Sequence, residues 1–576
     1  MSSPKRFVPP LLAAALILSA CAPATTPTAV PTQPSAATQP PIVSTLPVPP
    51  TEPPSEPAVL RIGAQDKPDT LNPAYAFLAS AYDVFDLTYS SLVKEAIDGS
   101  YAGDLAESWT ASDDGLLWTF TLKEGIKWHN GEDFKAADLA WAINAIKDDP
   151  DGWATLVNYT NGFKEITAPD DKTIRITLDY PIGNMLYRTS FLYAIYPPDF
   201  QTFTTPEDLQ NFTNDKLVGT GMFKLTIWDN DKGVVILDAH DDFYDGRARI
   251  DQVIYQYFDN TDALVQALKV GDIDLVTAVP ASAAESVRTF ENVKLVQQPS
   301  RSFDELIVNV SSADLETNTA SPALRDPKVR EALAYAINKQ DIVDIVWQGL
   351  GRPSWSIVAP ALGGGFWFDD GIQDRAFSLD KANQLLEEAG YLRGADGVRA
   401  KGDVRLDLRL QYDADSAEYP RIADLMTDWF KQIGVQVTPE PVDSDTLVAA
   451  TTGVGDFDVV IWGWGGDPDP DFILSIMLCD QFVVGGWSDS GYCNPEYDQL
   501  YLDQQQAVDP EVRQRIIFQM QDLLFRDLPY IVLYNYDNVQ AYRSDRFTGF
   551  PDTIANPSLT LTFDNSVILK DVEPVK

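Results

Sequence analysis

The residues best suited to hold a ligand lie in the segment 456–473, which reads DFDVVIWGWGGDPDPDFI. Its β-branched first half predicts a strand that ends in tryptophans, and Gly465 and Gly466 then interrupt the strand. A tryptophan offers flat apolar surface, glycines allow close backbone approach, and a carboxylate such as that of Asp467 can hold a cation. Gly, Pro and Asp are also common turn residues, so the segment by itself favours a structural turn over a ligand site.

The composition argues against several classes of function. Lys and Arg number 43 against 85 Asp and Glu, and so acidic a surface repels nucleic acids and anionic lipid headgroups. The sequence has two histidines, His129 and His240, and no CxxC motif, so we predict no metal site and no cofactor. His129 falls at a predicted turn, where a structural role is favoured over a ligand role. The length of 576 residues predicts about two to four domains.

Residues 1–20 have the pattern of a bacterial export signal. Lys5 and Arg6 precede the apolar run Phe7–Ile17, which is too short to span a bilayer. The tetrapeptide Leu-Ser-Ala-Cys that ends at Cys21 resembles a lipobox, which implies lipidation of Cys21; an ordinary signal peptide with an incidental cysteine is the alternative. No later run reaches the roughly 20 apolar residues of a membrane helix. We therefore expect an extracytoplasmic protein, lipid-anchored to the bacterial cell membrane at its periplasmic face or the cell surface.

The two remaining cysteines, Cys479 and Cys493, are expected to form a disulfide, because exported proteins meet oxidising conditions. Closing their loop of about 15 residues would contribute roughly 3 kcal/mol in the chain-entropy model. Two free buried thiols are the alternative.

Hydrophobic periodicity and punctuation by Gly and Pro predict the main elements of the body. We expect a helix over 81–93 and a final strand over 530–536. Two strand–helix–strand units with parallel strands are predicted, the first over 250–258, 262–270 and 272–276, and the second over 404–412, 417–433 and 435–437.

A series of ordered motifs carries a family resemblance. LAESW, SDDG and WTFTLKEGIKWHNG follow one another within residues 105–131 and predict a β-hairpin, with a helix over 136–146 after it. Further motifs are LVGTGMFKL at 217–225, RDPKVREALAYAINKQDIVDIVWQG at 325–349 and SLDKANQLLEEAG at 378–390. Together they resemble the bacterial extracellular solute-binding proteins of family 5, which serve peptide and nickel importers. Met222 departs from the family pattern, where proline is usual.

The resemblance runs from about residue 59 to the C-terminus and implies an α/β, two-lobed, periplasmic-binding-protein-like fold. The fold is class II, of the large peptide-binding type, with an extra subdomain in lobe I. The expected organisation is a signal peptide over 1–20, a lipidated cysteine with a Pro/Thr-rich tether over 21–58, lobe I over 59–90 with 215–309 and 535–576, its extra subdomain over 91–214, and lobe II over 310–534.

The resemblance also implies where a ligand binds. In peptide-binding members of the family, a tryptophan-containing strand ends in an aspartate that holds the peptide's α-ammonium. Trp464, three residues before Asp467, matches this pattern and implies Asp467 as the amine anchor, with Trp464 and the intervening glycines as its walls. We expect Trp462 to face the other side of the strand, in the core. Arg421 and Arg352 are possible partners for a ligand carboxylate, but neither lies in a matched motif, so dipeptide specificity is left open.

The family implies a monomeric substrate-binding lipoprotein of an ABC importer. It would capture di- or oligopeptides in an inter-lobe cleft and deliver them to permease subunits that work with a separate ATPase, without catalysis. Alternatives are a member that binds oligosaccharides or another solute, and a ligand-sensing module with the same fold. A secreted hydrolase with paired carboxylates is less favoured, since no GxSxG or HExxH motif supports hydrolysis.

Overall fold

The computed structural model describes residues 56–576, with internal gaps at 66, 77, 150, 154, 312–317, 453–454, 484–485, 552–559 and 562–565. The described residues belong to a single unit. The predicted signal peptide, the predicted lipidation site Cys21 and nearly all of the predicted tether lie outside them. No helix of the described part of the chain is both long enough and apolar enough to cross a bilayer.

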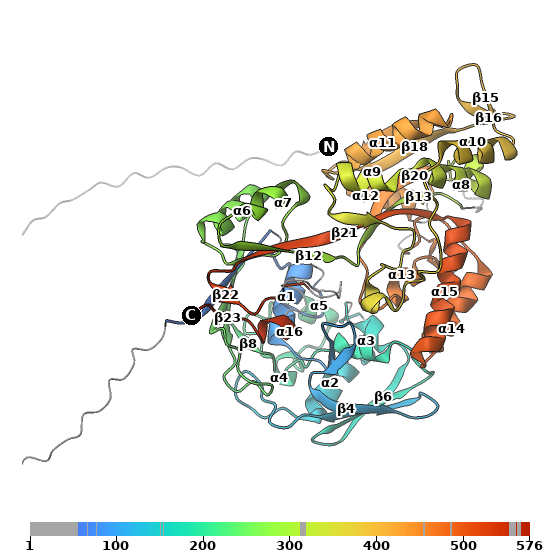
Figure 1. The fold of residues 1–576 in the computed structure, drawn as a ribbon. Helices are drawn as coiled ribbons and strands as arrows, with labels where there is room; N and C mark the ends of the chain where they lie inside the picture. Colours follow the sequence, from blue (N-terminus) through green and yellow to red (C-terminus); the bar gives the residue numbers. More distant parts are fainter. Residues whose placement is uncertain are drawn as a thin grey trace, which may run out of the picture. The chain divides into compact units, whose positions relative to one another are not determined.

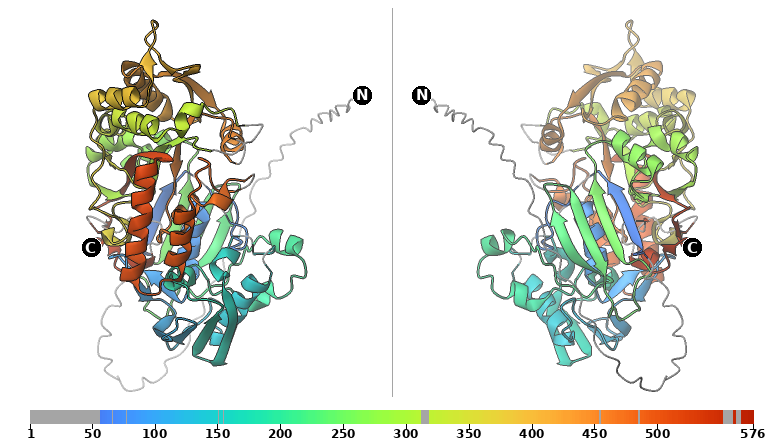
Figure 2. Two further views of the ribbon diagram at one scale, coloured as in Figure 1. Left: turned by 90° about the vertical axis from the view of Figure 1, so that its right-hand side faces the viewer. Right: turned by 90° about the vertical axis from the view of Figure 1, so that its left-hand side faces the viewer.

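A mixed sheet of twelve described strands passes through this unit. Its spatial order is β19 (Gln436–Val442), β18 (Asp407–Asp413), β20 (Val459–Trp464), β13 (Phe303–Val308), β21 (Tyr530–Arg543), β11 (Leu275–Val276), β1 (Val59–Ala64), β10 (Gln252–Tyr257), β9 (Val234–Ala239) and β8 (Phe223–Asp229), and β12 (Val293–Pro299) and β14 (Gly351–Pro353) also pair with β21. The blue strand β1 and its green neighbours lie side by side in the right-hand view of Figure 2.

Strand β21 connects the two halves of this sheet (Figure 1). Its first residues pair with β13, and its last residues pair with β11 and β12. The sequence predicts a strand over 530–536, but the strand continues to Arg543 because Val539–Tyr542 are buried and paired again.

Both predicted strand–helix–strand units are present. Strands β10 and β11 each pair in parallel with β1, and the intervening α6 (Thr261–Val270) ends at Gly271 with a φ of 84°. Strands β18 and β19 are parallel and are joined by α11 (Tyr419–Gln432). Strand β20 is parallel to β18 and antiparallel to β13, so neighbours on both sides fix its position.

A separate antiparallel sheet contains the predicted hairpin. Its order is β4 (Ala106–Ala111), β5 (Leu117–Leu122), β7 (Thr173–Leu178) and β6 (Phe163–Asp170). The hairpin is β4 and β5, and α2 (Ala136–Asp148) packs against β6. Trp118, Phe120 and Trp128 of the hairpin motif are buried in the core of this sheet.

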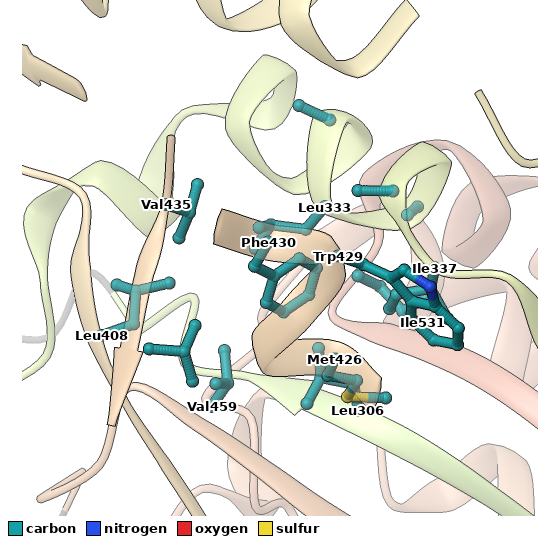
Figure 3. Close-up of a cluster of buried hydrophobic side chains, with 14 of the residues drawn as sticks. Leu306, Leu333, Ile337, Leu408, Met426, Trp429, Phe430, Val435, Val459 and Ile531 are labelled. Atoms are coloured by element: carbon teal, nitrogen blue, oxygen red, sulfur yellow. The ribbon is translucent and has the colours of Figure 1, made fainter. Parts of the chain in front are cut away.

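Helices α8 (Pro327–Ala336) and α11 cover one face of β13, β18 and β20 around a buried cluster (Figure 3). Phe430 and Met426 of α11 lie there between Leu333 of α8 and Val459 of β20. Asp326 caps α8 as its motif predicts, since its carboxylate accepts the backbone N–H of Lys328. Other buried clusters lie around the antiparallel sheet and around β1 and β10. The lobe boundaries given above stay predictions.

One predicted helix is shorter than the sequence suggests. Helix α1 (Ala79–Thr88) ends five residues before Val93, which begins the short strand β2 (Val93–Glu95). The reason is tertiary packing, because the carbonyl of Thr88 accepts the backbone N–H of Gly221 instead of continuing the helix.

The remaining helices are α3 (Met185–Ser190), α4 (Pro197–Phe200), α5 (Pro206–Gln210), α7 (Ala281–Arg288), α9 (Lys339–Ile345), α10 (Leu379–Glu388), α12 (Ser444–Thr451), α13 (Asp471–Ser475), α14 (Pro495–Gln506), α15 (Pro510–Asp527) and α16 (Ser566–Leu569), with the 3₁₀ segments η1 (Val157–Thr160), η2 (Pro322–Arg325), η3 (Leu362–Gly365) and η4 (Cys479–Gln481). The remaining strands are β3 (Tyr101–Gly103), β15 (Leu392–Arg393), β16 (Arg399–Lys401), β17 (Val404–Arg405), β22 (Phe547–Thr548) and β23 (Glu573–Pro574).

Candidate functional site

The candidate site begins at the carboxyl end of β20, where Trp464 lies opposite Phe303 of β13. Close packing in this corner depends on glycine. A Cβ atom at Gly463 would lie 2.3 Å from the carboxylate of Asp304, and one at Gly466 would lie 2.9 Å from the carbonyl oxygen of Arg301. Gly465 has open space, with its nearest neighbouring atom 3.9 Å away. Gly466 is therefore the glycine that lets the turn after β20 lie against the chain before β13.

Asp467 follows this turn and is half-buried. Its carboxylate accepts a hydrogen bond of 2.7 Å from the hydroxyl of Tyr187 in α3, 280 residues earlier in the sequence. Burial raises the pKa of Asp467, while the Tyr187 hydrogen bond and the positive charge of Arg301 act to lower it. The carboxylate thus lies in a desolvated position with a nearby donor and a nearby cation.

Two clusters of aromatic rings involve neighbours of Asp467. The ring of Trp464, three residues earlier in the chain, lies edge-on to Phe472 and Trp487, with centroid separations of 6.1 and 6.4 Å. Tyr187, which donates to Asp467, packs against Tyr159 and Phe191 at 5.8 and 5.3 Å. A carboxylate close to aromatic rings suits an organic cation, because ring faces also attract positive charge.

The other two acids of the turn are held by helices. Asp469 forms a buried bidentate ion pair with Arg513 of α15, at 2.5 and 2.6 Å. Asp471 accepts a 2.6 Å hydrogen bond from Gln504 of α14. These contacts fix the backbone of the turn. Asp467 differs from the other two acids because its carboxylate is the one that contacts α3. The sequence does not indicate these partners, since only packing brings α14 and α15 beside the turn.

The expectation that Trp462 faces the other side of the strand from Trp464 is wrong, although Trp462 packs against a buried cluster as expected. Residues two apart on a strand share a face, and Trp462 and Trp464 both pack against the same cluster beneath β20. Across the strand pair, Trp462 lies opposite Glu305 of β13.

Beneath these tryptophans lie buried acids that the sequence analysis missed. Glu305 is fully buried, and its carboxyl oxygens have no hydrogen-bond partner among the described residues. Burial, with the negative charges of Asp489 and Asp304, raises the pKa of Glu305 well above its usual value. Burial also raises the pKa of Asp489 to about 7, and Asp489 accepts a hydrogen bond from the hydroxyl of Tyr530.

The two arginines proposed as partners for a ligand carboxylate are not paired with Asp467, and their surroundings differ. Arg352 of β14 forms an ion pair with Asp537 at 3.3 Å. Arg421 lies on the exposed face of α11. Arg301, which no motif singled out, is the cation whose charge acts on Asp467.

Cys479 and Cys493 form a disulfide. It closes the loop that carries Trp487 of the aromatic wall and the buried Asp489. His129 lies edge-on to His240, with ring centroids 5.0 Å apart. The Nδ1 atom of His129 accepts the backbone N–H of Gly219, and burial lowers the pKa of His129 to about 3.

Known proteins resemble this chain over most of its length. The model for bacterial extracellular solute-binding proteins, family 5 (middle part), matches residues 100–482. The oligopeptide-binding protein AppA of Bacillus subtilis is 26% identical over 492 residues, which cover 85% of this chain and 88% of AppA. Heme-binding protein A of Haemophilus influenzae is 28% identical over 450 residues, which cover 74% of this chain and 77% of that protein.

Solved structures show the same fold. The ABC transporter substrate-binding protein CtaP of Listeria monocytogenes has a TM-score of 0.77 at 23% identity, covering 91% of this chain and 100% of that chain. The chain therefore has the two-lobed α/β fold of periplasmic binding proteins of the peptide-binding type, which confirms the predicted fold class.

Proposed function

This chain belongs to the bacterial extracellular solute-binding proteins of family 5, and we propose that it captures peptides by their free amino terminus for an ABC importer. Family members bind peptides or other small solutes and work with ABC permeases. The observation that carries the proposal is the half-buried carboxylate of Asp467, which accepts a hydrogen bond from Tyr187 and follows the strand that ends at Trp464. The role is capture and delivery, without catalysis.

The physical reason is the cost of an unpaired charge. An ammonium that is removed from water needs a carboxylate close by, and a carboxylate in a desolvated site gains equally from the ammonium. In the structure, the neutral hydroxyl of Tyr187 donates to Asp467. A peptide ammonium would add charge-assisted hydrogen bonds, which are roughly twice as strong as neutral ones.

The surroundings of the two arginines proposed for a ligand carboxylate favour oligopeptides over dipeptides as ligands. A dipeptide binder needs a guanidinium placed to hold the carboxylate, but Arg352 is paired with Asp537 and Arg421 lies on an exposed helix face. Longer peptides can be held along their backbone, as an added strand is held, and then need no single partner for their carboxylate.

A screen of ligands tests this proposal. Tri- to nonapeptides with free amino termini should raise the melting temperature of the purified chain, because a ligand that binds the folded state stabilises it by mass action. The same peptides with acetylated amino termini should give no shift. An equal shift from acetylated peptides would contradict amine capture, and shifts from oligosaccharides or heme alone would identify a different solute.

We further propose that Cys21 carries the lipid that retains the protein at the membrane, where the permease is. The support is the lipobox-like sequence before Cys21 and the acidic composition, which offers no electrostatic attraction to anionic lipids. Intact mass of the membrane fraction should show acylation at Cys21, and Cys21→Ser should release the protein. Membrane retention of the Cys21→Ser chain would contradict lipid anchoring.

A further inference from the structure

A cavity of about 500 Å³ lies beside the turn that carries Asp467. Aromatic and aliphatic side chains supply most of its lining, among them Tyr101, Trp118, Phe366, Trp367 and Leu186. The cavity volume falls within the range of about 300–1,000 Å³ that is usual for small-molecule sites.

The cavity borders the neighbours of the proposed amine anchor Asp467. Tyr187, whose hydroxyl donates to Asp467, also lines the cavity, and so does Pro468, the next residue after Asp467. A group that enters the cavity therefore lies beside residues that flank Asp467 or donate to it.

The charged groups of the lining neutralise one another or face solvent. Asp469 and Arg513 form their buried ion pair at one wall, and the guanidinium of Arg513 lies 4.9 Å from the ring centre of Trp367. Asp98 is exposed and accepts hydrogen bonds from Ser100. The interior thus offers flat apolar surface with no net charge, which suits an uncharged apolar group.

Tight backbone contacts bound the cavity. Gly183 donates its N–H to the carbonyl of Gln505 at 2.7 Å, and a Cβ atom at Gly183 would lie 2.5 Å from the carbonyl of Ala507. A Cβ atom at Gly99 would lie 3.2 Å from the backbone of Gly363. The surrounding segments therefore meet in close packing, and the space between them is a bounded compartment.

We propose that this compartment receives a large apolar side chain from the first or second residue of the bound peptide. The inference rests on the proposed capture of peptides, and it adds a preference for aromatic or branched aliphatic residues near the amino terminus. Burial of a phenylalanine side chain corresponds to a gain in affinity of about tenfold to hundredfold over alanine.

Titration calorimetry with Ala-Ala-Ala, Phe-Ala-Ala and Ala-Phe-Ala tests the inference on the full chain. At least one phenylalanine peptide should bind about tenfold or more tightly than Ala-Ala-Ala. Leu186→Trp fills the compartment and should abolish this preference while leaving the affinity for Ala-Ala-Ala within about twofold. Leu392→Trp, at a 67% exposed position of β15, is the matched control and should keep the preference.

A second variant guards against misfolding of the first. Phe366→Ala removes one aromatic wall and should weaken the phenylalanine peptides about fivefold or more, whereas Phe377→Ala, at a 41% exposed position, should not. Equal affinities of the wild-type chain for all three peptides would overturn the compartment but leave amine capture standing. Failure of all three to bind, with no shift from any longer free peptide in the thermal screen, would overturn the proposed function and the inference with it.

Discussion

Two groups of buried carboxylates lie around β20, and their partners give them different roles. Asp467 lies after the strand, where burial raises its pKa while a tyrosine hydroxyl and the charge of Arg301 act against that rise. Glu305 and Asp489 lie beneath the strand, where burial raises both of their pKa values and the negative charge of Asp489 raises that of Glu305 further. Among the described residues, a positive charge acts on Asp467 and on neither of the other two acids, which makes Asp467 the better candidate for an ionised carboxylate that binds a cation.

The acidic turn itself contains a related contrast, between Asp467 and the ion-paired Asp469, and its test has the largest expected effect on stability. Asp469→Asn removes one half of the buried pair with Arg513, so the free energy of unfolding should fall by about 3–5 kcal/mol. Asp467→Asn should change it by no more than about 1 kcal/mol, because the lost hydrogen bond is offset by relief from desolvation. Urea unfolding of both variants measures this difference. Equal losses would mean that Asp467 is as structural as Asp469.

The disulfide joins the two groups, because its loop carries both Trp487 and Asp489. Replacing Cys479 and Cys493 together by serine should lower the free energy of unfolding by roughly 3 kcal/mol, as expected from closing a loop of this length. It should also weaken peptide binding, because Trp487 loses its support beside Trp464. Urea unfolding and calorimetry measure the two effects. Unchanged values for both would show that packing alone holds the loop.

The buried acids should make stability depend on pH. Asp489 keeps its proton up to about pH 7 in the folded chain, whereas an unfolded aspartate loses it near pH 4. Between these values the folded state binds more protons, so the free energy of unfolding falls as pH rises. Asp489→Asn should make this fall shallower by about 1.4 kcal/mol per pH unit between pH 5 and 6.

Urea unfolding at half-unit pH steps measures that slope. Asp113→Asn, at an exposed turn, should leave the slope unchanged and serves as the control. An identical slope in the Asp489→Asn chain would mean that Asp489 is ionised in the folded state.

The sequence could predict much of this architecture because its signals are local. The capped start of α8, the hairpin β4–β5 and the strand that leads to Trp464 follow from spacing and turn residues. The partners of the turn could not be predicted, because Tyr187 reaches Asp467 across 280 residues and Arg513 reaches Asp469 across 44. Contacts of this kind depend on how the sheets pack, which no local pattern in the chain records.

The same limit explains why the sequence could not show whether the two arginines suggested for a ligand carboxylate lie in the site. Arg352 and Arg421 have the right chemistry for a carboxylate, but chemistry alone does not place a side chain. In the structure one is paired with Asp537 and the other lies on an exposed helix face. Arg301 precedes the buried strand β13 without any motif, and only the close approach of Gly466 brings it beside the turn.

The most direct test of the central claim is a binding cycle that pairs Asp467→Asn with acetylation of the peptide's amino terminus. For a free peptide, Asp467→Asn should weaken binding by a hundredfold or more, because the ammonium loses its buried partner. For the acetylated peptide, the same substitution should change the affinity by less than about threefold, and Asp113→Asn should change neither. Equal losses for free and acetylated peptides would show that Asp467 shapes the site without holding an ammonium.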